Sequence, residues 1–259
     1  MTIGASLRRR TGASFAYMLG PSMGGWLYEA GGVHLPFVIV ALMAIAGAAA
    51  FAALTLPSRH APRDPVPIAA IVRVPAVAAC AMAVVIIGAT VSMLEPILAL
   101  HLQSIGVSPA RIGLVFGVGG GASMILHPIG GRLGDRWGAR RLTLWGLVVT
   151  AAAMPALTMA RSVTSAIVLF VVQGVGLAMA ITPSLSYMAE VVADRGVGSF
   201  GVAYGLYNVA WAIGLLGGPA VGGFLYERIG FLQLTLIWAP AVLVLTALLR
   251  ARSFGVTSA

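Results

Sequence analysis

The sequence predicts an all-α polytopic membrane protein built from eight transmembrane helices. Apolar residues make up 59% of the chain and charged residues only 9%, whereas soluble proteins carry about 25% charged residues. Eight apolar stretches are close to or longer than the roughly 20 residues that a helix needs to cross a bilayer. They lack the alternating pattern of barrel strands, so the backbone inside the bilayer must form helices. The predicted spans are 12–28, 34–56, 75–100, 110–130, 141–160, 163–189, 198–225 and 231–250.

The first span, 12–28, carries a phrase that returns in the seventh. Residues 20–29 are Gly-Pro-Ser-Met-Gly-Gly-Trp-Leu-Tyr-Glu and residues 218–227 are Gly-Pro-Ala-Val-Gly-Gly-Phe-Leu-Tyr-Glu, with seven of ten positions identical. A repeat at this distance indicates two large halves of a membrane protein, related as parallel repeats. The arginines at 8–10 before an apolar run also resemble the start of a signal peptide. A cleaved segment, however, would have no reason to share a sequence with the seventh span.

Between the second and third spans, residues 57–74 hold four prolines and mixed charges, which predicts a linker between two helical groups. The seventh span is the fifth after this linker, so its repeat partner, the first span, should also be the fifth of its half. We therefore expect that four helices are missing before residue 12. The predicted division is a remnant of an N-terminal six-helix half, the cytoplasmic linker, a C-terminal six-helix half and a cytoplasmic tail, at 1–56, 57–74, 75–250 and 251–259.

Charge sets the orientation of the spans. All sixteen basic residues are arginine, and thirteen lie at cytoplasmic ends if residue 1 is cytoplasmic. This is the positive-inside pattern, and it predicts that both termini and the linker face the cytoplasm. The net charge of +9 therefore reflects membrane topology, and we expect no binding of nucleic acid.

The third span carries Glu95, the one ionisable residue well inside a predicted span. A carboxylate within the bilayer is costly, so a functional role is the default hypothesis. Pro96 follows it and bends the helix, which suits the lining of a cavity. We expect Glu95 to couple transport to protons. The alternatives are a contact to substrate and a protonated packing residue.

Small residues at four-residue spacing predict close contacts between helices. The fourth span has such a ladder at Gly113, Gly117 and Gly121, which makes it the natural partner for a similar face on the first or seventh span. Those two faces are formed by Gly12, Ala16, Gly20 and Gly24, and by Ala210, Gly214, Gly218 and Gly222. We expect the glycine face of the seventh span to be exposed to lipid, because the helix it should pack against is missing.

The later spans supply candidates for a cavity lining. The fifth span is apolar, and the eighth returns the C-terminus to the cytoplasm. His101 and His127 lie near span ends and are expected at the membrane interface. The candidate lining residues, each of which could equally be an ordinary packing residue, are Gln173 and Tyr187 in the sixth span and Tyr204, Tyr207, Asn208 and Trp211 in the seventh.

The loop after the fourth span, Gly-Gly-Arg-Leu-Gly-Asp-Arg-Trp-Gly-Ala-Arg-Arg-Leu at 130–142, resembles the cytoplasmic signature of the major facilitator superfamily. The Gly-Pro-x-x-Gly-Gly phrase is similar to that superfamily's antiporter motif on the fifth helix, with an echo on the eleventh. Met93, Leu94, Glu95 and Pro96 resemble the seventh helix of drug:proton antiporters and vesicular amine transporters. The vesicular transporters have acids in their tenth and eleventh helices, where this chain has Thr182-Pro183 and Asn208.

The resemblance implies helices five to twelve of a twelve-helix carrier. It assigns gating to Gly131, Asp135, Arg136, Gly138, Arg140 and Arg141, and the antiporter motif with its repeat to Gly20, Pro21, Gly24, Gly25, Gly218, Pro219, Gly222 and Gly223. We expect Asp135 to hold the cytoplasmic side shut in one conformation, by facing a helix N-terminus and pairing with nearby arginines.

The predicted function is proton-coupled efflux of small lipophilic or drug-like molecules by alternating access in the plasma membrane. The expected partners are the lipid bilayer, the substrate, protons and the missing N-terminal half. Metal-ligand clusters, nucleophile–base pairs and phosphate-binding loops are absent from the sequence. We therefore expect neither an enzyme nor a bound cofactor or metal. The alternative is a transport-incompetent fragment, or a half-carrier that needs a partner polypeptide.

Overall fold

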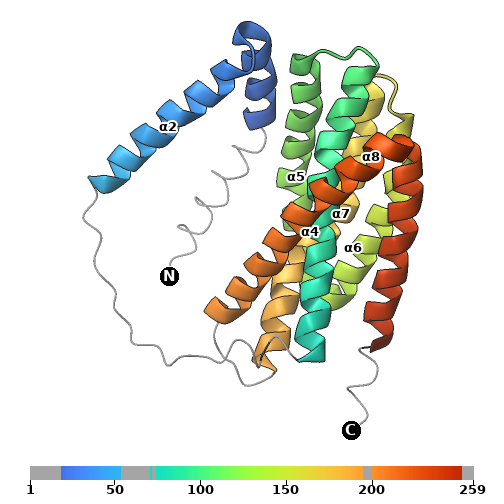
Figure 1. The fold of residues 1–259 in the computed structure, drawn as a ribbon. Helices are drawn as coiled ribbons and strands as arrows, with labels where there is room; N and C mark the ends of the chain where they lie inside the picture. The colour runs from blue at the N-terminus through green and yellow to red at the C-terminus, as the bar shows by residue number, and fades with distance from the viewer. Residues whose placement is uncertain (1–18, 54–70, 72–73, 195–199, 253–259) are drawn as a thin grey trace.

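The computed structural model describes residues 19–53, 71, 74–194 and 200–252, and every element in these ranges is a helix (Figure 1). The predicted all-α membrane fold is confirmed. The arginines at 8–10, nearly all of the linker and the tail from residue 253 lie outside the described residues. The elements are helix 19–31, α2 (His34–Ala52), α4 (Pro75–Ser104), α5 (Pro109–Trp137), α6 (Ala139–Ala153), the 3-10 helix η1 (Met154–Met159), α7 (Val163–Ala193) and α8 (Phe200–Arg252).

Six described helices are long and apolar enough to cross a membrane, and one of these is α8, which bends back on itself. The bend is at Gly230, whose φ of 78° and ψ of 174° are open to glycine because it lacks a Cβ atom. It divides α8 into a first arm, 200–229, and a second arm, 231–252 (Figure 1). These arms correspond to the seventh and eighth predicted spans. Gly138, at φ 86°, makes the equivalent sharp turn between α5 and α6.

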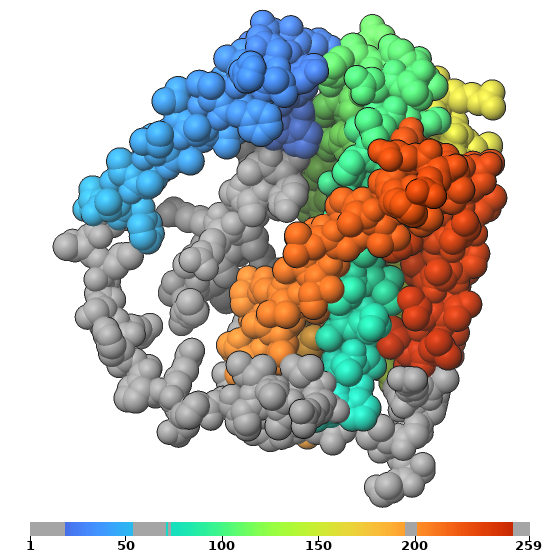
Figure 2. Space-filling view, viewed as in Figure 1, coloured from blue at the N-terminus to red at the C-terminus, as the bar shows by residue number. Residues whose placement is uncertain are grey.

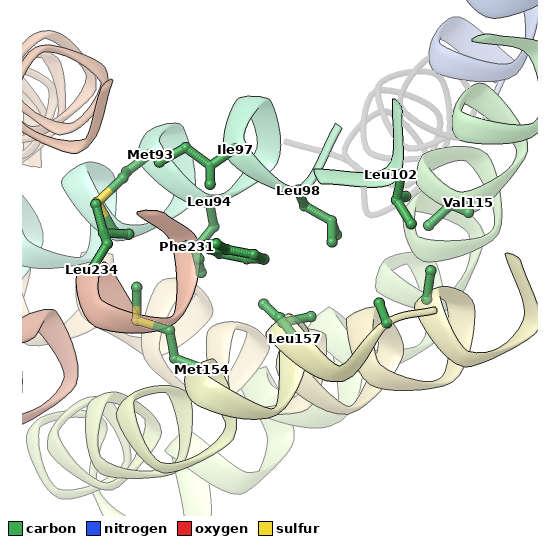
Figure 3. Packing of buried hydrophobic residues seen from close by; sticks show 12 residues of the cluster. Met93, Leu94, Ile97, Leu98, Leu102, Val115, Met154, Leu157, Phe231 and Leu234 are labelled. Atoms are coloured by element: carbon green, nitrogen blue, oxygen red, sulfur yellow. The ribbon is translucent and has the colours of Figure 1, made fainter. Parts of the chain in front are cut away.

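The helices from α4 onward form one bundle with an apolar core. α4 packs mainly on α8, while α7 packs on both α5 and α6. The largest core cluster brings together Met93, Leu94 and Leu98 of α4, Leu157 of η1 and Phe231 of the second arm (Figure 3). A polar contact adds to this apolar packing, because the indole N–H of Trp238 donates a hydrogen bond to the Thr90 hydroxyl at 3.1 Å.

The two N-terminal helices differ in how they contact this bundle. Helix 19–31 lies against the start of α5, whereas α2 runs away from the bundle (Figures 1 and 2). None of the residues of α2 is buried, although its mean hydropathy of 2.4 is typical of a membrane span. The six-helix group is therefore packed as a unit, and the two N-terminal helices contact it through helix 19–31.

Candidate functional site

Glu95 lies on the open side of α4. Its neighbours Met93, Leu94, Ile97 and Leu98 are at most 3% exposed in the bundle core. Glu95 and Pro96 are both exposed, so the helix turns its one mid-span acid away from the core. Within the described residues, the carboxylate has no hydrogen-bond or ion-pair partner. The structure thus leaves this carboxylate free to meet a substrate, a proton or another helix.

The candidates on the first arm of α8 lie nearer the start of α4. The carbonyl oxygen of Trp211 is 3.0 Å from a Cβ position at Gly88, and Gly88 precedes Glu95 by seven residues, or about 10 Å of helix. Tyr207 stacks on Trp211 with 6.1 Å between ring centroids, and its hydroxyl group hydrogen bonds with that of Ser184 at 3.3 Å. These aromatic rings form a platform beside α7 and do not touch Glu95.

Asn208 is exposed on the same arm. Its side-chain amide donates to the carbonyl oxygen of Tyr204, one turn earlier in the same helix, at 2.7 Å. Tyr204 is 51% exposed. These two residues therefore present polar atoms at an open helix surface, and their role in a cavity lining stays a prediction.

Gln173 and Tyr187 are placed elsewhere. Gln173 is fully buried in α7, and neither its amide nitrogen nor its carbonyl oxygen has a hydrogen-bond partner in the described residues. Tyr187 is 6% exposed and belongs to a buried cluster with Cys80 and Ala139. Both side chains lie in helix interfaces, apart from the open surface that carries Glu95, and their role in a lining stays a prediction.

The residues of the cytoplasmic motif fall into two groups: glycines at helix contacts and turns, and charged residues that are mostly exposed. Gly130 and Gly134 bring α5 against α7, where Cβ positions would lie 2.7 Å from the carbonyl oxygen of Ala178 and 3.0 Å from the Pro183 side chain. Gly131 is near Thr182, and Gly138 makes the turn into α6. Asp135, Arg136 and Arg141 are exposed, while Arg140 is partly buried with an unpartnered Nε atom. Asp135 forms no ion pair within the described residues, so its gating role stays a prediction.

Helix 19–31 meets α5 at Gly113, the first glycine of the ladder in the fourth span, but not through the predicted face: Cβ atoms at Gly20 and Gly24 would have no described neighbour within 4 Å, and the contact is made by Pro21 and Gly25. A Cβ atom at Gly25 would meet the carbonyl oxygen of Pro109, and one at Gly113 would meet that of Pro21. The Ser22 hydroxyl donates to the Gly113 carbonyl oxygen at 3.2 Å. The backbones of the two helices therefore approach as closely as glycine allows.

Glu29 completes this contact at the end of helix 19–31. Its Oε1 accepts the backbone N–H of Ala110 at 2.9 Å, one of the N–H groups at the start of α5 that have no partner inside the helix. This hydrogen bond, with smaller contributions from the Ser108 side chain and the charge of Arg111, lowers the pKa of Glu29. Glu29 thus caps α5 from another helix.

The expectation for the seventh span is wrong. Its glycine face is not open to lipid but packs on α4, where a Cβ atom at Gly214 would lie 2.5 Å from the Val85 carbonyl oxygen. Gly218 and Gly222 are equally close to Ala89 and Met93. The expectation assigned this face to a helix that the sequence lacks. In the structure, a helix of the same half covers that face.

A polar contact between α5 and α7 was not anticipated. His127 Nδ1 and Thr182 Oγ1 are 2.7 Å apart, and each residue directly precedes a proline inside its helix. Sequence reasoning placed His127 at the membrane interface because it lies near the end of the predicted span. The structure continues α5 to Trp137, which leaves His127 ten residues from the end. The His-Pro and Thr-Pro dipeptides were the available signal.

No group of three or more His, Cys, Asp or Glu side chains in the described part of the chain could hold a metal ion. The described site instead combines an exposed acid in a long apolar helix, helix breaks at glycine and proline, and helix contacts made by small residues.

Comparison with known proteins agrees with this picture. The family model of the Major Facilitator Superfamily matches residues 80–256. MFS-type transporter SLC18B1 of Homo sapiens is 28% identical over 258 residues, which cover 95% of this chain and 55% of that protein. A probable vesicular acetylcholine transporter-B of Danio rerio is 26% identical over 90% of this chain and 50% of its own length. The chromaffin granule amine transporter of Homo sapiens is 24% identical over 87% of this chain and 44% of its own length.

The chain spans about half the length of the curated relatives that it matches. The family model covers more than half of this chain, and the matched region contains the helices of the bundle except the first five residues of α4. The apolar helices and the family match together identify an integral membrane protein. The chain belongs to the Major Facilitator Superfamily.

Proposed function

We propose that this chain works in proton-coupled efflux of small lipophilic or drug-like molecules by alternating access, with Glu95 as the coupling acid. The observation that carries the proposal is the position of Glu95, nine residues from the nearer end of α4 and exposed beside Pro96. The other acids in the described helices lie within a few residues of a helix end or turn, as Asp135, Glu190 and Glu227 do. A carboxyl group at mid-span is therefore the residue placed to exchange a proton with a closed cavity.

Two considerations support small lipophilic substrates. The names of two relatives state transport of acetylcholine and of amines, which fits a carrier for small molecules. The positions that resemble the acidic sites of vesicular amine transporters hold Thr182-Pro183 and Asn208 here, and Asn208 is exposed and neutral. With fewer acids available, attraction for a cation is weaker, and apolar contacts with residues such as Trp211 would contribute more of the binding energy.

The proposed cycle uses one proton. Glu95 takes up the proton from the outer side and becomes neutral, and it releases the proton toward the cytoplasm as a charged carboxylate. The charged and neutral forms favour different arrangements of the helices, because the charged form needs water or a polar partner. Substrate leaves in the opposite direction. The proposal places the protein in the plasma membrane with both termini in the cytoplasm.

Glu95→Gln tests the proposal. The amide has the shape of the carboxyl group but cannot release a proton, so substrate efflux driven by a pH gradient should fall to background in proteoliposomes of the active carrier. Substrate counterflow, which needs no net proton movement, should persist. Glu190→Gln is the matched control, because Glu190 is an exposed acid three residues from the end of α7. Unchanged pH-driven efflux by Glu95→Gln would refute the assignment.

A second candidate is a half-carrier that needs a partner polypeptide. It is favoured by α2, which has no buried residue, and by the open face of α4 that carries Glu95. The expected result is that the purified 259-residue chain shows no uptake or efflux in liposomes. Activity that appears only when a complementary polypeptide is co-reconstituted would establish this candidate, while robust transport by the chain alone would exclude it.

A further inference from the structure

Two buried polar side chains on neighbouring helices have no hydrogen-bond partner within the described part of the chain. Gln173 of α7 is fully buried, and both its Nε2 and its Oε1 atom are unpartnered there. Thr150 of α6 is 1% exposed, and its Oγ1 atom is unpartnered as well. Buried polar groups nearly always have a partner, because an unpaired one loses its hydration without compensation. Two such groups on packed helices therefore indicate a ligand between them.

The Thr150 hydroxyl group is turned away from its own helix. Other buried threonines in the helices donate to the carbonyl oxygen four residues earlier, as Thr90, Thr143 and Thr246 do. Thr150 makes no such bond, and its Oγ1 atom lies 2.7 Å from a Cβ position at Gly176 of α7. Because Gly176 has no Cβ atom, the hydroxyl group has room to reach the backbone of α7.

The register of α6 and α7 places Gln173 close to this hydroxyl group. A Cβ atom at Gly176 would meet Thr150, and one at Gly146 would meet the backbone of Ala180, so the two helices run antiparallel at these contacts. Gln173 precedes Gly176 by three residues, or about 4.5 Å of helix. Gln173 is therefore level with the last turn of α6, directly after Thr150.

The last turn of α6 is also where that helix breaks. α6 ends at Ala153, and the 3-10 helix η1 starts at Met154 with Pro155 in its first turn. Pro155 has no N–H group, so it cannot donate to the carbonyl oxygen of Ala151 as the next residue of an α-helix would. In membrane helices, hydroxyl side chains and ordered water satisfy the carbonyl groups that a proline frees. An amide, a hydroxyl group and a freed carbonyl group therefore lie within about one turn of each other.

We propose that Gln173 and Thr150 bind an ordered internal water molecule between α6 and α7, beside the helix break at Pro155. The chemistry of the unpaired atoms selects this ligand. The Gln173 amide has two N–H donors and an acceptor oxygen, and the Thr150 hydroxyl group can donate and accept. A cation would leave the amide N–H groups unpaired, and an anion would leave the amide oxygen unpaired. Water both donates and accepts, and a buried water makes about three such bonds.

The water also accounts for a glutamine in this part of the core. Met154 and Leu157 of η1 are fully buried and belong to the largest apolar cluster, so their side chains offer Gln173 no hydrogen bond (Figure 3). The bound water gives α6 and α7 a polar connection at the level where α6 loses its helical hydrogen bonding. The break at Pro155 is thereby held in place by a group that can exchange its partners.

Replacement by apolar residues of similar size tests the water through the sign of the effect on stability. Gln173→Met and Thr150→Val each remove one partner of the water and leave the other group in place. Each should lower the melting temperature in detergent by about 2–12 °C. If the two groups were simply dry and unpaired, each substitution would remove an uncompensated polar atom and raise the melting temperature.

The double variant tests whether the two groups share one ligand. The combined loss for Gln173→Met with Thr150→Val should be smaller than the sum of the two single losses, because both act through the same water. Thr143→Val is the matched control, since Thr143 is fully buried in α6 and donates to the Ala139 carbonyl oxygen of its own helix. Its loss should add to that of Gln173→Met.

X-ray footprinting detects the water itself, because radiolysis turns a bound water into a hydroxyl radical that oxidises the nearest reactive side chain. Met154 is fully buried and level with Gln173, so it should be oxidised in the wild type and stay unmodified in the double variant. Met188 is equally buried, in the cluster with Cys80, and should stay unmodified in both proteins.

Three results would overturn the proposal. A higher melting temperature for either single variant would mean that the groups are dry. Additive losses in the double variant would mean that Gln173 and Thr150 share no ligand. An unmodified Met154 in the wild type would exclude the water even if the losses are coupled, because coupling alone would then reflect a direct hydrogen bond between the two side chains.

Discussion

Replacing Gly214 with alanine should loosen the packing of the first arm of α8 on α4. The added methyl group would lie 2.5 Å from the Val85 carbonyl oxygen, 2.8 Å from the Ala89 nitrogen and 3.0 Å from the Gly88 carbonyl carbon. All three are backbone atoms of α4, so the methyl group fits only if the two helices separate. Overpacking of this kind costs about 1–3 kcal/mol.

Gly217→Ala provides the matched comparison on the same arm. Its methyl group would meet no described atom within 4 Å. Both substitutions gain the same helix propensity, about 1 kcal/mol for glycine to alanine, so this contribution cancels in the difference between the variants. The remaining difference is the steric cost at Gly214, about 1–3 kcal/mol. At 2–4 °C per kcal/mol for a chain of this size, Gly214→Ala should melt about 2–12 °C below Gly217→Ala.

The measurement is thermal unfolding in detergent, followed by tryptophan fluorescence. Trp211 and Trp238 are suitable reporters because both lie at the contact between α8 and α4. Equal melting temperatures for the two alanine variants would refute the reasoning, since they would show that the close approach at Gly214 does not restrict the two helices. A lower melting temperature for Gly217→Ala would refute it as well.

Three further predictions concern the helix ends and the topology. The lowered pKa of Glu29 means that its capping of α5 is present above the ordinary pKa of about 4.3 and is lost as the pH falls through the lowered value. At a pH where Glu29 is charged, a cysteine at position 22 should therefore be labelled faster in Glu29→Gln than in the wild type at the same pH, and Glu227→Gln should have no such effect. Asp135→Asn should shift the balance between inward- and outward-facing states of the active carrier, and unchanged accessibility would exclude a gating role. A cysteine at position 60 should react only with reagents that reach the cytoplasm, whereas labelling from outside would overturn the predicted orientation.

The helices were predictable because membrane spans leave strong signals in the sequence. The predicted span 231–250 differs from the second arm of α8 by two residues at its C-terminal end. Length and apolarity suffice there, since in a bilayer a long apolar run has no alternative to a helix. The C-terminal end of α5 differs more, because α5 continues to Trp137 through charged residues that lie beyond the apolar run. Hydropathy marks where a helix leaves the lipid and does not mark where it ends.

The helix partners were less predictable, because a glycine ladder indicates close packing without naming the neighbour. Gly214 and Gly218 were expected to face lipid, and they pack on α4. The four-residue spacing groups these glycines on one face, as the structure does, but it does not say which helix covers that face. Gln173 shows a similar gap, since its polarity suggested a cavity lining while its helix rotation buries it. Rotation is set by tertiary packing, which a single sequence does not reveal.

The orientation of Glu95 has a consequence for coupling. The core side of α4 is filled by Met93, Leu94, Ile97 and Leu98, and the carboxylate points the other way. A change in its charge therefore acts mainly on the side of α4 that faces away from this core. The charge of Glu95 acts on the element that faces this exposed side of α4. In a carrier with two halves, that element belongs to the other half. If Glu95 carries the proton, protonation changes the relative stability of arrangements of the two halves, and about 1.4 kcal/mol would shift their ratio tenfold.

On the predicted domain division, in which these helices belong to different halves, the contact between helix 19–31 and α5 would lie at the boundary between the halves. It combines tight backbone packing at Gly25 and Gly113 with the charge-assisted cap from Glu29. Packing of this kind is either made or broken, since small residues leave no intermediate separation with good contacts. Alternating access requires discrete conformational states and a protonation event whose free energy differs between them. An all-or-none contact at this boundary would supply the discrete states. An acid that faces across the boundary would supply the protonation event.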